Sequence, residues 1–166
     1  MSDLFRPPAL DWQRLSPKYL KVRVLATLLG HGVWVPASTF GLWYLLSDTQ
    51  FGFVVWAWLG LFATLFIWNL VRAPRWVRSW GYAEHNDNIY VTHGLLFRTL
   101  TCVPYGRMQL VEVDSGPIDR LFDLADVKMV TASSSGSVEI PGLDRAAAEA
   151  VRDRFIARGN ELQESI

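Results

Sequence analysis

Hydrophobic residues follow two patterns along this chain, with long runs before Trp80 and short alternating runs after it. The run 51–71 has no charged side chain, and in the run 24–46 His31 is the one group that titrates near neutral pH. Because a helix rises about 1.5 Å per residue, roughly 20 apolar residues cross the hydrocarbon core of a bilayer. The pattern therefore predicts two membrane-spanning helices, at about 22–46 and 51–71.

Positive charges flank these two runs but are missing from the connection between them. Lys and Arg are frequent in residues 1–23 and again in 72–78, whereas the connection 47–50 contains neither. Since cytoplasmic flanks collect Lys and Arg, both termini are expected on the cytoplasmic side of the membrane, which is the inner face of the plasma membrane if the source is prokaryotic. The short connection makes the two helices antiparallel neighbours, preceded by a cytoplasmic segment at 1–21.

The second half of the chain has the period-two pattern of short strands, followed by a helix. The expected strands are 80–84, 89–93, 97–103, 108–115, 126–132 and 138–140, with a helical turn at 117–122. Ala148, Val151 and Phe155 form the buried stripe of the last helix, which Gly159 is placed to end. The expected fold class is α+β: a two-helix transmembrane hairpin, then a bent sheet or partial barrel with a C-terminal helix over 79–159, and a flexible tail at 160–166.

Charge and composition narrow the function. The formal net charge of zero is divided between a basic half, residues 1–78, and an acidic half, residues 79–166. A nucleic-acid partner would need a basic soluble face, so none is expected. The single cysteine, Cys102, excludes an internal disulfide and a cysteine-cluster zinc site. Because the nucleotide-binding, zinc-protease and serine-hydrolase motifs are also missing, no enzyme activity, catalytic residue, metal or cofactor is expected.

Two polar residues lie inside the predicted spans. His31 stands between Gly30 and Gly32 in the first, and Asn69 lies in the second. An ionisable group in a membrane is a functional-site candidate, but neither span contains an Asp or Glu to complete a proton relay. The favoured interpretation is packing, with His31 hydrogen-bonded to a backbone carbonyl or to Asn69 of the facing helix.

Four segments of the second half carry a family resemblance. Residues 94–98, 103–111, 115–125 and 140–143 read GLLFR, VPYGRMQLV, SGPIDRLFDLA and IPGL. In order and spacing they resemble the bacterial PH-like domains of the second type (bPH2, DUF304), and two preceding spans are the arrangement of YdbS-like membrane proteins. The resemblance implies a seven-stranded bent sheet with a C-terminal helix, and no family-wide catalytic residue or cofactor. Asp123 stands where the family has Gly. If that Gly serves a positive φ, Asp is among the better substitutes, and if it allows close contact with a partner or ligand, Asp123 would hinder that contact.

The resemblance also implies a function. It points to a non-enzymatic, membrane-anchored interaction module that assembles as a homo- or hetero-oligomer with another PH-like-domain membrane protein. Arg107, Gln109 and Arg120 lie in the matching motifs and form the candidate interaction patch, because strand alternation would align Arg107 with Gln109. The structural alternative is that Arg120 pairs with a neighbouring carboxylate.

The alternative function is recognition of anionic lipid at the cytoplasmic membrane face. Such recognition needs a basic pocket, whereas the Lys and Arg residues of the acidic half are scattered along the sequence. Arg72, Arg75 and Arg78 follow the second span directly and are expected to contact lipid headgroups in either case.

Overall fold

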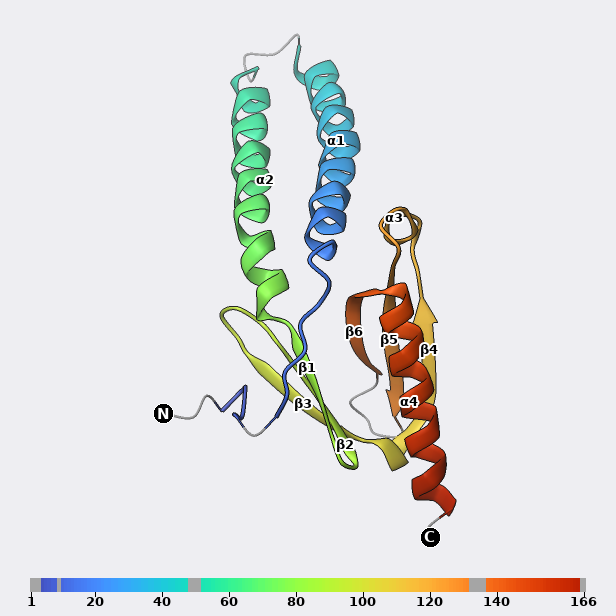
Figure 1. The fold of residues 1–166 in the computed structure, drawn as a ribbon. Helices are drawn as coiled ribbons and strands as arrows, with labels where there is room; N and C mark the ends of the chain where they lie inside the picture. The colour runs from blue at the N-terminus through green and yellow to red at the C-terminus, as the bar shows by residue number, and fades with distance from the viewer. Residues whose placement is uncertain (1–3, 9, 48–51, 132–136, 165–166) are drawn as a thin grey trace. The chain divides into compact units, whose positions relative to one another are not determined.

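The computed structural model describes residues 4–8, 10–47, 52–131 and 137–164, and its elements are labelled in Figure 1. They follow in the order α1 (Tyr19–Leu46), α2 (Phe53–Ser79), β1 (Gly81–His85), β2 (Asn88–His93), β3 (Thr99–Pro104), the 3-10 turn η1 (Tyr105–Arg107), β4 (Met108–Asp114), α3 (Pro117–Leu121), β5 (Leu124–Thr131), β6 (Ser137–Asp144) and α4 (Arg145–Glu164). Apart from Ser47, the expected connection between the apolar runs lies outside the described residues. The chain forms two compact units, residues 20–74 and residues 1–19 with 75–166.

The unit 20–74 contains most of α1 and α2. Along both helices large apolar side chains are exposed, among them Trp34, Phe40 and Trp56. Among the described helices, α2 is the one that is long and apolar enough to cross a bilayer. The helix α1 is similarly long, with 28 residues against 27, and contains His31 and Pro36. The second predicted span is thus supported by its composition, and the first stays a prediction.

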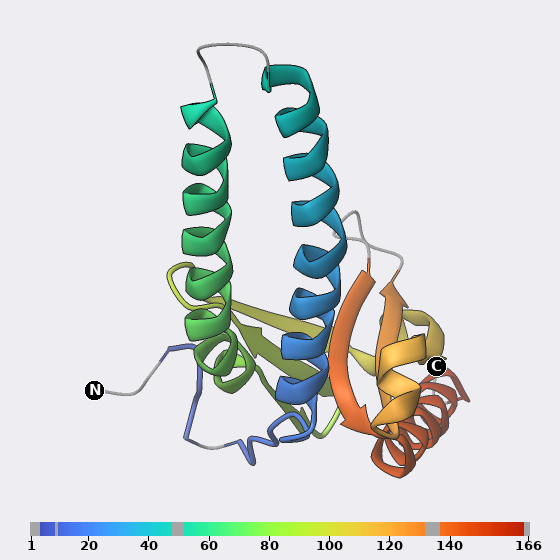
Figure 2. The ribbon, with the colours of Figure 1, turned by 90° about the horizontal axis from the view of Figure 1, so that it is seen from above.

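The second unit contains two antiparallel three-stranded sheets, β1-β2-β3 and β4-β5-β6 (Figures 1 and 2). The six expected strands are present, and they lie in two sheets because the chain leaves the first sheet at Pro104 and turns through η1 before β4. Proline has no N–H to continue a ladder. The resemblance implied a seventh strand, and the described residues add only an isolated bridge between Gln13 and Tyr82.

The helix α4 covers the core of this unit. It packs against η1, β4 and β5, and its predicted stripe of Ala148, Val151 and Phe155 is buried. The ring centroids of Tyr105 and Phe155 lie 5.4 Å apart. Tyr105 belongs to the VPYGR motif and is fully buried, so burial raises its pKa to about 12. The VPYGR motif, one of those that carry the family resemblance, therefore contributes to the packing of the core.

The structure agrees with the expectation for the backbone of Asp123 and contradicts the expectation that Gly159 ends the last helix. Asp123 has a φ of +57°, which agrees with the alternative that the residue at this position serves a positive φ. Gly159 does not end α4, which continues to Glu164 and includes the first residues of the expected flexible tail. A terminating glycine adopts the left-handed conformation, and Gly159 is not among the residues with positive φ.

The segment 13–18, here called the N-terminal strap, joins the outer edges of the two sheets. Gln13 exchanges two backbone hydrogen bonds with Tyr82 of β1, with N···O distances of 2.8 and 3.0 Å. Three residues later, the Ser16 N–H donates to the Gly142 carbonyl of β6 at 3.0 Å. Because unpaired edge groups are costly when they are screened from water, the strap stabilises both sheets at once.

Asp126 of β5 bonds to Gly142, the residue of β6 that the strap contacts. Its Oδ1 accepts a hydrogen bond of 2.6 Å from the Gly142 N–H. Burial raises the pKa of Asp126 to about 6, although the Gly142 bond lowers it, and nearby carboxylates raise it further. The folded state therefore holds this proton more tightly than the unfolded chain, whose ordinary value is 3.8.

Stability should therefore depend on pH through Asp126. The stabilisation from its proton is complete below pH 3.8 and is lost as the pH rises through about 6. We expect Asp126→Asn, which keeps the acceptor but removes the charge, to raise the free energy of unfolding by about 1 kcal/mol at neutral pH and by nothing in acid. Thermal unfolding in nanodiscs across this range measures the difference. The exposed Asp11→Asn is the control and should show no such trend, and a less stable Asp126→Asn at neutral pH would contradict the account.

Candidate functional site

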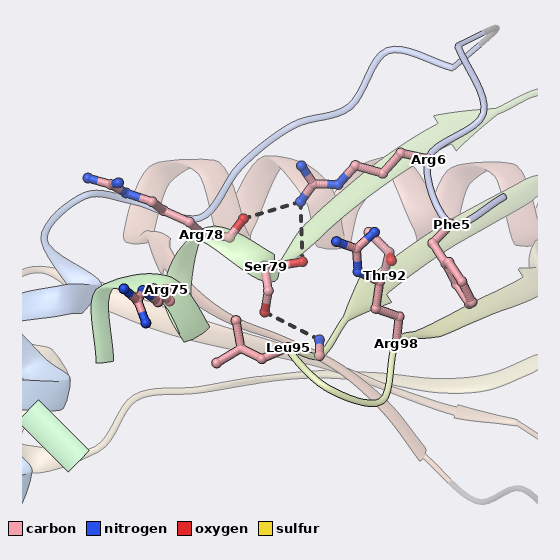
Figure 3. Close-up of a pocket in the computed structure, with 9 residues that line it drawn as sticks. Phe5, Arg6, Arg75, Arg78, Ser79, Thr92, Leu95 and Arg98 are labelled. Carbon is pink, nitrogen blue, oxygen red and sulfur yellow. Dashed lines mark hydrogen bonds between the residues drawn. The ribbon is translucent and has the colours of Figure 1, made fainter. Parts of the chain in front are cut away.

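A pocket of about 340 Å³ opens where α2 ends and the first sheet begins (Figure 3). All of its lining residues belong to the unit that contains the sheets. We call it the arginine pocket, and it is lined by Phe5, Arg6, Arg75, Arg78, Ser79, Thr92, Gly94, Leu95 and Arg98. Three segments that are far apart in the sequence supply these side chains.

The last turns of α2 supply one wall of the pocket. Arg75 and Arg78 are three residues apart, a spacing that places side chains on one side of a helix. Both are exposed, and a basic residue in the last turn is favourable beside the negative end of the helix dipole. The local sequence therefore presents two guanidinium groups together.

Arg6 closes the pocket from the N-terminal segment. Its Nη2 lies within hydrogen-bond distance of three backbone carbonyls at the end of α2, those of Arg78, Ser79 and Trp80, at 3.2, 3.2 and 3.3 Å. The last carbonyls of a helix have no partner within the helix, so Arg6 acts as its C-terminal cap. The cap brings the positive charge of Arg6 beside those of Arg75 and Arg78.

The turn between β2 and β3 supplies the third wall. The Gly94 N–H donates to Ser79 Oγ at 3.3 Å, and Ser79 Oγ donates to the Trp76 carbonyl at 2.7 Å. Gly94 has a φ of +112°, and a Cβ there would lie 1.9 Å from the carbonyl oxygen of Phe97. Glycine is therefore required at this position, and the turn places Arg98 on the pocket.

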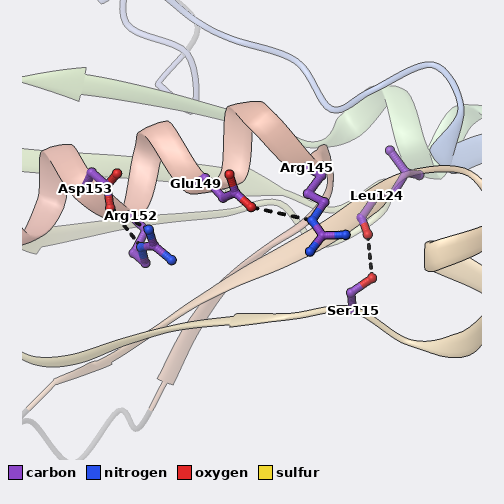
Figure 4. A network of polar contacts seen from close by, with 6 residues as sticks. All are labelled: Ser115, Leu124, Arg145, Glu149, Arg152 and Asp153. Atoms are coloured by element: carbon purple, nitrogen blue, oxygen red, sulfur yellow. Dashed lines mark hydrogen bonds and ion pairs between the residues drawn. The ribbon is translucent and has the colours of Figure 1, made fainter.

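The pocket is strongly cationic. Four arginines line it, and no carboxylate is among the described lining residues. On α4 of the same unit, Arg145 lies 3.5 Å from Glu149 and Arg152 lies 2.7 Å from Asp153 (Figure 4). Guanidinium groups match phosphate and carboxylate oxygens in geometry and charge, so the arrangement is suited to an anion.

Neighbouring groups add little to this charge. His93 lies beside the pocket and stacks on Trp80 with 4.6 Å between ring centroids. Burial lowers the pKa of His93, so its ring is neutral at physiological pH. Within the described residues, no three His, Cys, Asp or Glu side chains come close enough to hold a metal ion. The positive charge of the site therefore comes from its arginines.

The pocket does not contradict the expectation that the basic residues of the acidic half are scattered, because three of its four arginines lie outside that half. Arg98 of the acidic half joins Arg75 and Arg78, two of the three arginines expected at lipid headgroups, and Arg6. The third, Arg72, lies over the ring of Trp68, with 5.7 Å from its guanidinium carbon to the ring centroid. Hydrogen bonds between distant segments of the folded chain bring Arg6 and Arg98 to the end of α2. No spacing in the sequence could therefore have predicted that they lie beside Arg75 and Arg78.

The expectation that strand alternation aligns Arg107 with Gln109 is wrong. Arg107 belongs to η1, and Gln109 has no partner opposite it at a register shift of β4, so strand alternation does not relate them. Arg120 follows the other end of β4, a strand that spans about 20 Å, and its Nε donates to the Ser115 carbonyl at 3.0 Å. Arg107 and Gln109 are exposed at the start of an edge strand, and Arg120 is remote from them.

His31 and Asn69 each have a backbone partner in their own helix. His31 Nδ1 lies 3.0 Å from the Thr27 carbonyl oxygen, and Asn69 Nδ2 donates to the Leu65 carbonyl at 3.1 Å. The His31 ring also packs on Phe66 of α2, with 5.3 Å between ring centroids. This geometry agrees with the carbonyl alternative, and the role of both residues in helix packing stays a prediction.

Comparison with known proteins agrees with this fold. The family profile described as bacterial PH domain (bPH_2) matches residues 24–158. The chain is 35% identical over 95 residues to the UPF0699 transmembrane protein YdbS of Bacillus subtilis (strain 168). That alignment covers 57% of this chain and 56% of the relative, so the chain spans little more than half of the relative's length. No solved structure matches the chain significantly.

The cap formed by Arg6 should be measurable as stability. We expect Arg6→Gln to lower the free energy of unfolding by about 1 kcal/mol, because the last carbonyls of α2 lose a charged donor. The midpoint of thermal unfolding in nanodiscs should fall by about 2–4 °C. The matched control is Arg14→Gln, which removes the same charge from an exposed position of the same segment. Equal midpoints for the two variants would show that Arg6 does not cap the helix.

Proposed function

Because the chain belongs to the bacterial PH domain family, we propose that it is a membrane-anchored, non-enzymatic PH-like module whose arginine pocket recognises anionic lipid headgroups. The single observation that carries this proposal is the gathering of Arg6, Arg75, Arg78 and Arg98 at the end of an apolar helix. In this proposal 22–46 and 51–71 both span a bacterial plasma membrane, with the termini and the PH-like domain (79–159) in the cytoplasm.

The sequence around the end of α2 supports a position at the membrane surface. The apolar run ends at Val71, and Arg72 begins the basic stretch that follows. Trp76 and Trp80 come next, with 5.4 Å between their ring centroids. Trp is enriched at the headgroup level of membrane proteins, and Arg near a helix end extends toward the same level. The arginine pocket would therefore open where lipid phosphates are concentrated.

The distribution of charge supports an orienting role for the pocket. Residues 79–166 carry more acidic than basic side chains, so most of this half is repelled by an anionic leaflet. The arginine pocket is positively charged and is attracted to that leaflet. The electrostatic field of the domain would therefore turn the pocket toward the lipid. Tethering by α2 keeps the headgroups at a high effective concentration, so weak individual contacts suffice.

Charge reversal in the pocket tests this function. We expect Arg75→Glu with Arg78→Glu to reduce several-fold the anionic lipid that co-purifies in mild detergent, because each basic residue near an anionic surface contributes about 1 kcal/mol. Lipid mass spectrometry of the full-length protein measures the enrichment of phosphatidylglycerol and cardiolipin over phosphatidylethanolamine. The control is Arg145→Glu with Arg152→Glu on α4, which changes the net charge equally. Unchanged enrichment in the pocket variant, or an equal loss in the control, would reject the function.

A second candidate function is assembly with another PH-like-domain membrane protein or with a second copy. The observation that favours it is the strand β4, which in the described part of the chain pairs with β5 alone and forms an edge of its sheet. Leu110 of this strand is exposed, and Arg107 and Gln109 lie at its start. An exposed edge can be extended by a strand of a partner. The interaction patch would then be this edge, and Arg120 would mark its far end.

Site-specific photo-cross-linking tests the edge. We expect a benzophenone amino acid at Gln109 to yield a cross-linked complex in native membranes, because the side chain lies on an edge that a partner strand would cover. The same probe at Ala157, on the exposed face of α4, is the control. Mass spectrometry identifies the partner. No product at Gln109, or equal products at both sites, would exclude assembly through β4.

A further inference from the structure

The turn between β2 and β3 exposes two large apolar side chains. Leu96 is 83% exposed and Phe97 is 89% exposed, the highest values for large hydrophobic residues in the described part of the chain. Both side chains are more exposed than any large hydrophobic residue described on α1 or α2. A protein in water gains nothing from such a tip, so its exposure indicates a partner surface.

The base of this turn is held firmly. Thr92 is buried, and its Oγ1 donates to the Thr99 carbonyl at 3.2 Å across the open end of the turn. Gly94 supplies the left-handed conformation and bonds to Ser79 of α2. The apolar tip is therefore presented outward by a built turn that is tied to the last turn of a membrane-type helix.

The partner is indicated by what surrounds the tip. Arg98 follows Phe97 directly and lines the arginine pocket together with Leu95, so the cationic and apolar surfaces are continuous. Apolar side chains beside Lys or Arg are the pattern of segments that enter the boundary between headgroups and acyl chains. A protein partner would not require the arginines, and a surface of anionic lipid uses both features.

We infer that Leu96 and Phe97 insert into the cytoplasmic leaflet at the boundary between headgroups and acyl chains, while the arginine pocket binds the phosphates above them. This inference rests on the proposed lipid-binding function and adds a second, apolar point of attachment. With α2 and the tip both in the lipid, the domain has two fixed points and cannot rotate freely about the helix axis. The tip would thereby set the orientation of both sheets to the membrane.

Depth measurement by nitroxide labelling tests the insertion. In the full-length chain with Cys102→Ser, single cysteines are introduced as Leu96→Cys, Phe97→Cys and the control Ala157→Cys. Each variant keeps one apolar residue of the tip or both, and circular dichroism checks its fold. The probes are molecular oxygen, which concentrates in the bilayer, and a water-soluble nickel chelate. Relaxation is recorded in nanodiscs of phosphatidylcholine with phosphatidylglycerol.

The expected result is a ratio of oxygen to nickel accessibility several-fold higher at the two tip positions than at Ala157→Cys. Equal ratios would overturn the inference, and so would spin–spin broadening from a second copy or protection from both probes by a protein partner. Its failure is distinguishable from failure of the proposed function. Water-exposed labels with retained enrichment of anionic lipid would reject insertion alone, and inserted labels with no enrichment would reject only headgroup recognition.

Discussion

The requirement that sheet edges be hydrogen-bonded determines much of this structure. Sheet β1-β2-β3 ends at β1 and sheet β4-β5-β6 ends at β6, and neither sheet closes on itself. The N-terminal strap meets both edges, through Gln13 with Tyr82 and Ser16 with Gly142. Without it, β1 and β6 would also lack these partners, and a sheet of three strands is near the lower limit of independent stability.

The strap also determines where the arginine pocket forms. Once Gln13 is bound at β1, the preceding residues are held near the start of the first sheet, and Arg6 reaches the carbonyls at the end of α2. One side chain thereby caps a helix and completes a cationic wall. The charged cap and the pocket depend on each other, because the unpaired carbonyls of α2 fix the guanidinium that faces the anion site.

The motifs that carry the family resemblance serve mainly the fold. Tyr105 of VPYGR is buried against Phe155, and Asp123, at a position where the family has Gly, adopts a positive φ. The GLLFR segment differs, because Gly94 shapes a turn whose tip and Arg98 face outward. Motif residues chosen as an interaction patch, Arg107 and Arg120, are instead separated by the length of β4. Residues that belong to the family motifs therefore stabilise the same fold without lying together in one site.

Local patterns in the sequence determined the apolar helices, the six strands, the buried stripe of α4 and the basic stretch after Val71, because each depends on neighbours a few residues away. The tertiary structure alone decided the division into two sheets, the strap and the arginine pocket. Arg6 and Arg98 meet Arg75 and Arg78 through hydrogen bonds between distant segments, which no periodicity encodes. Gly159 shows the same limit, since the chain continues as helix where a local rule places its end.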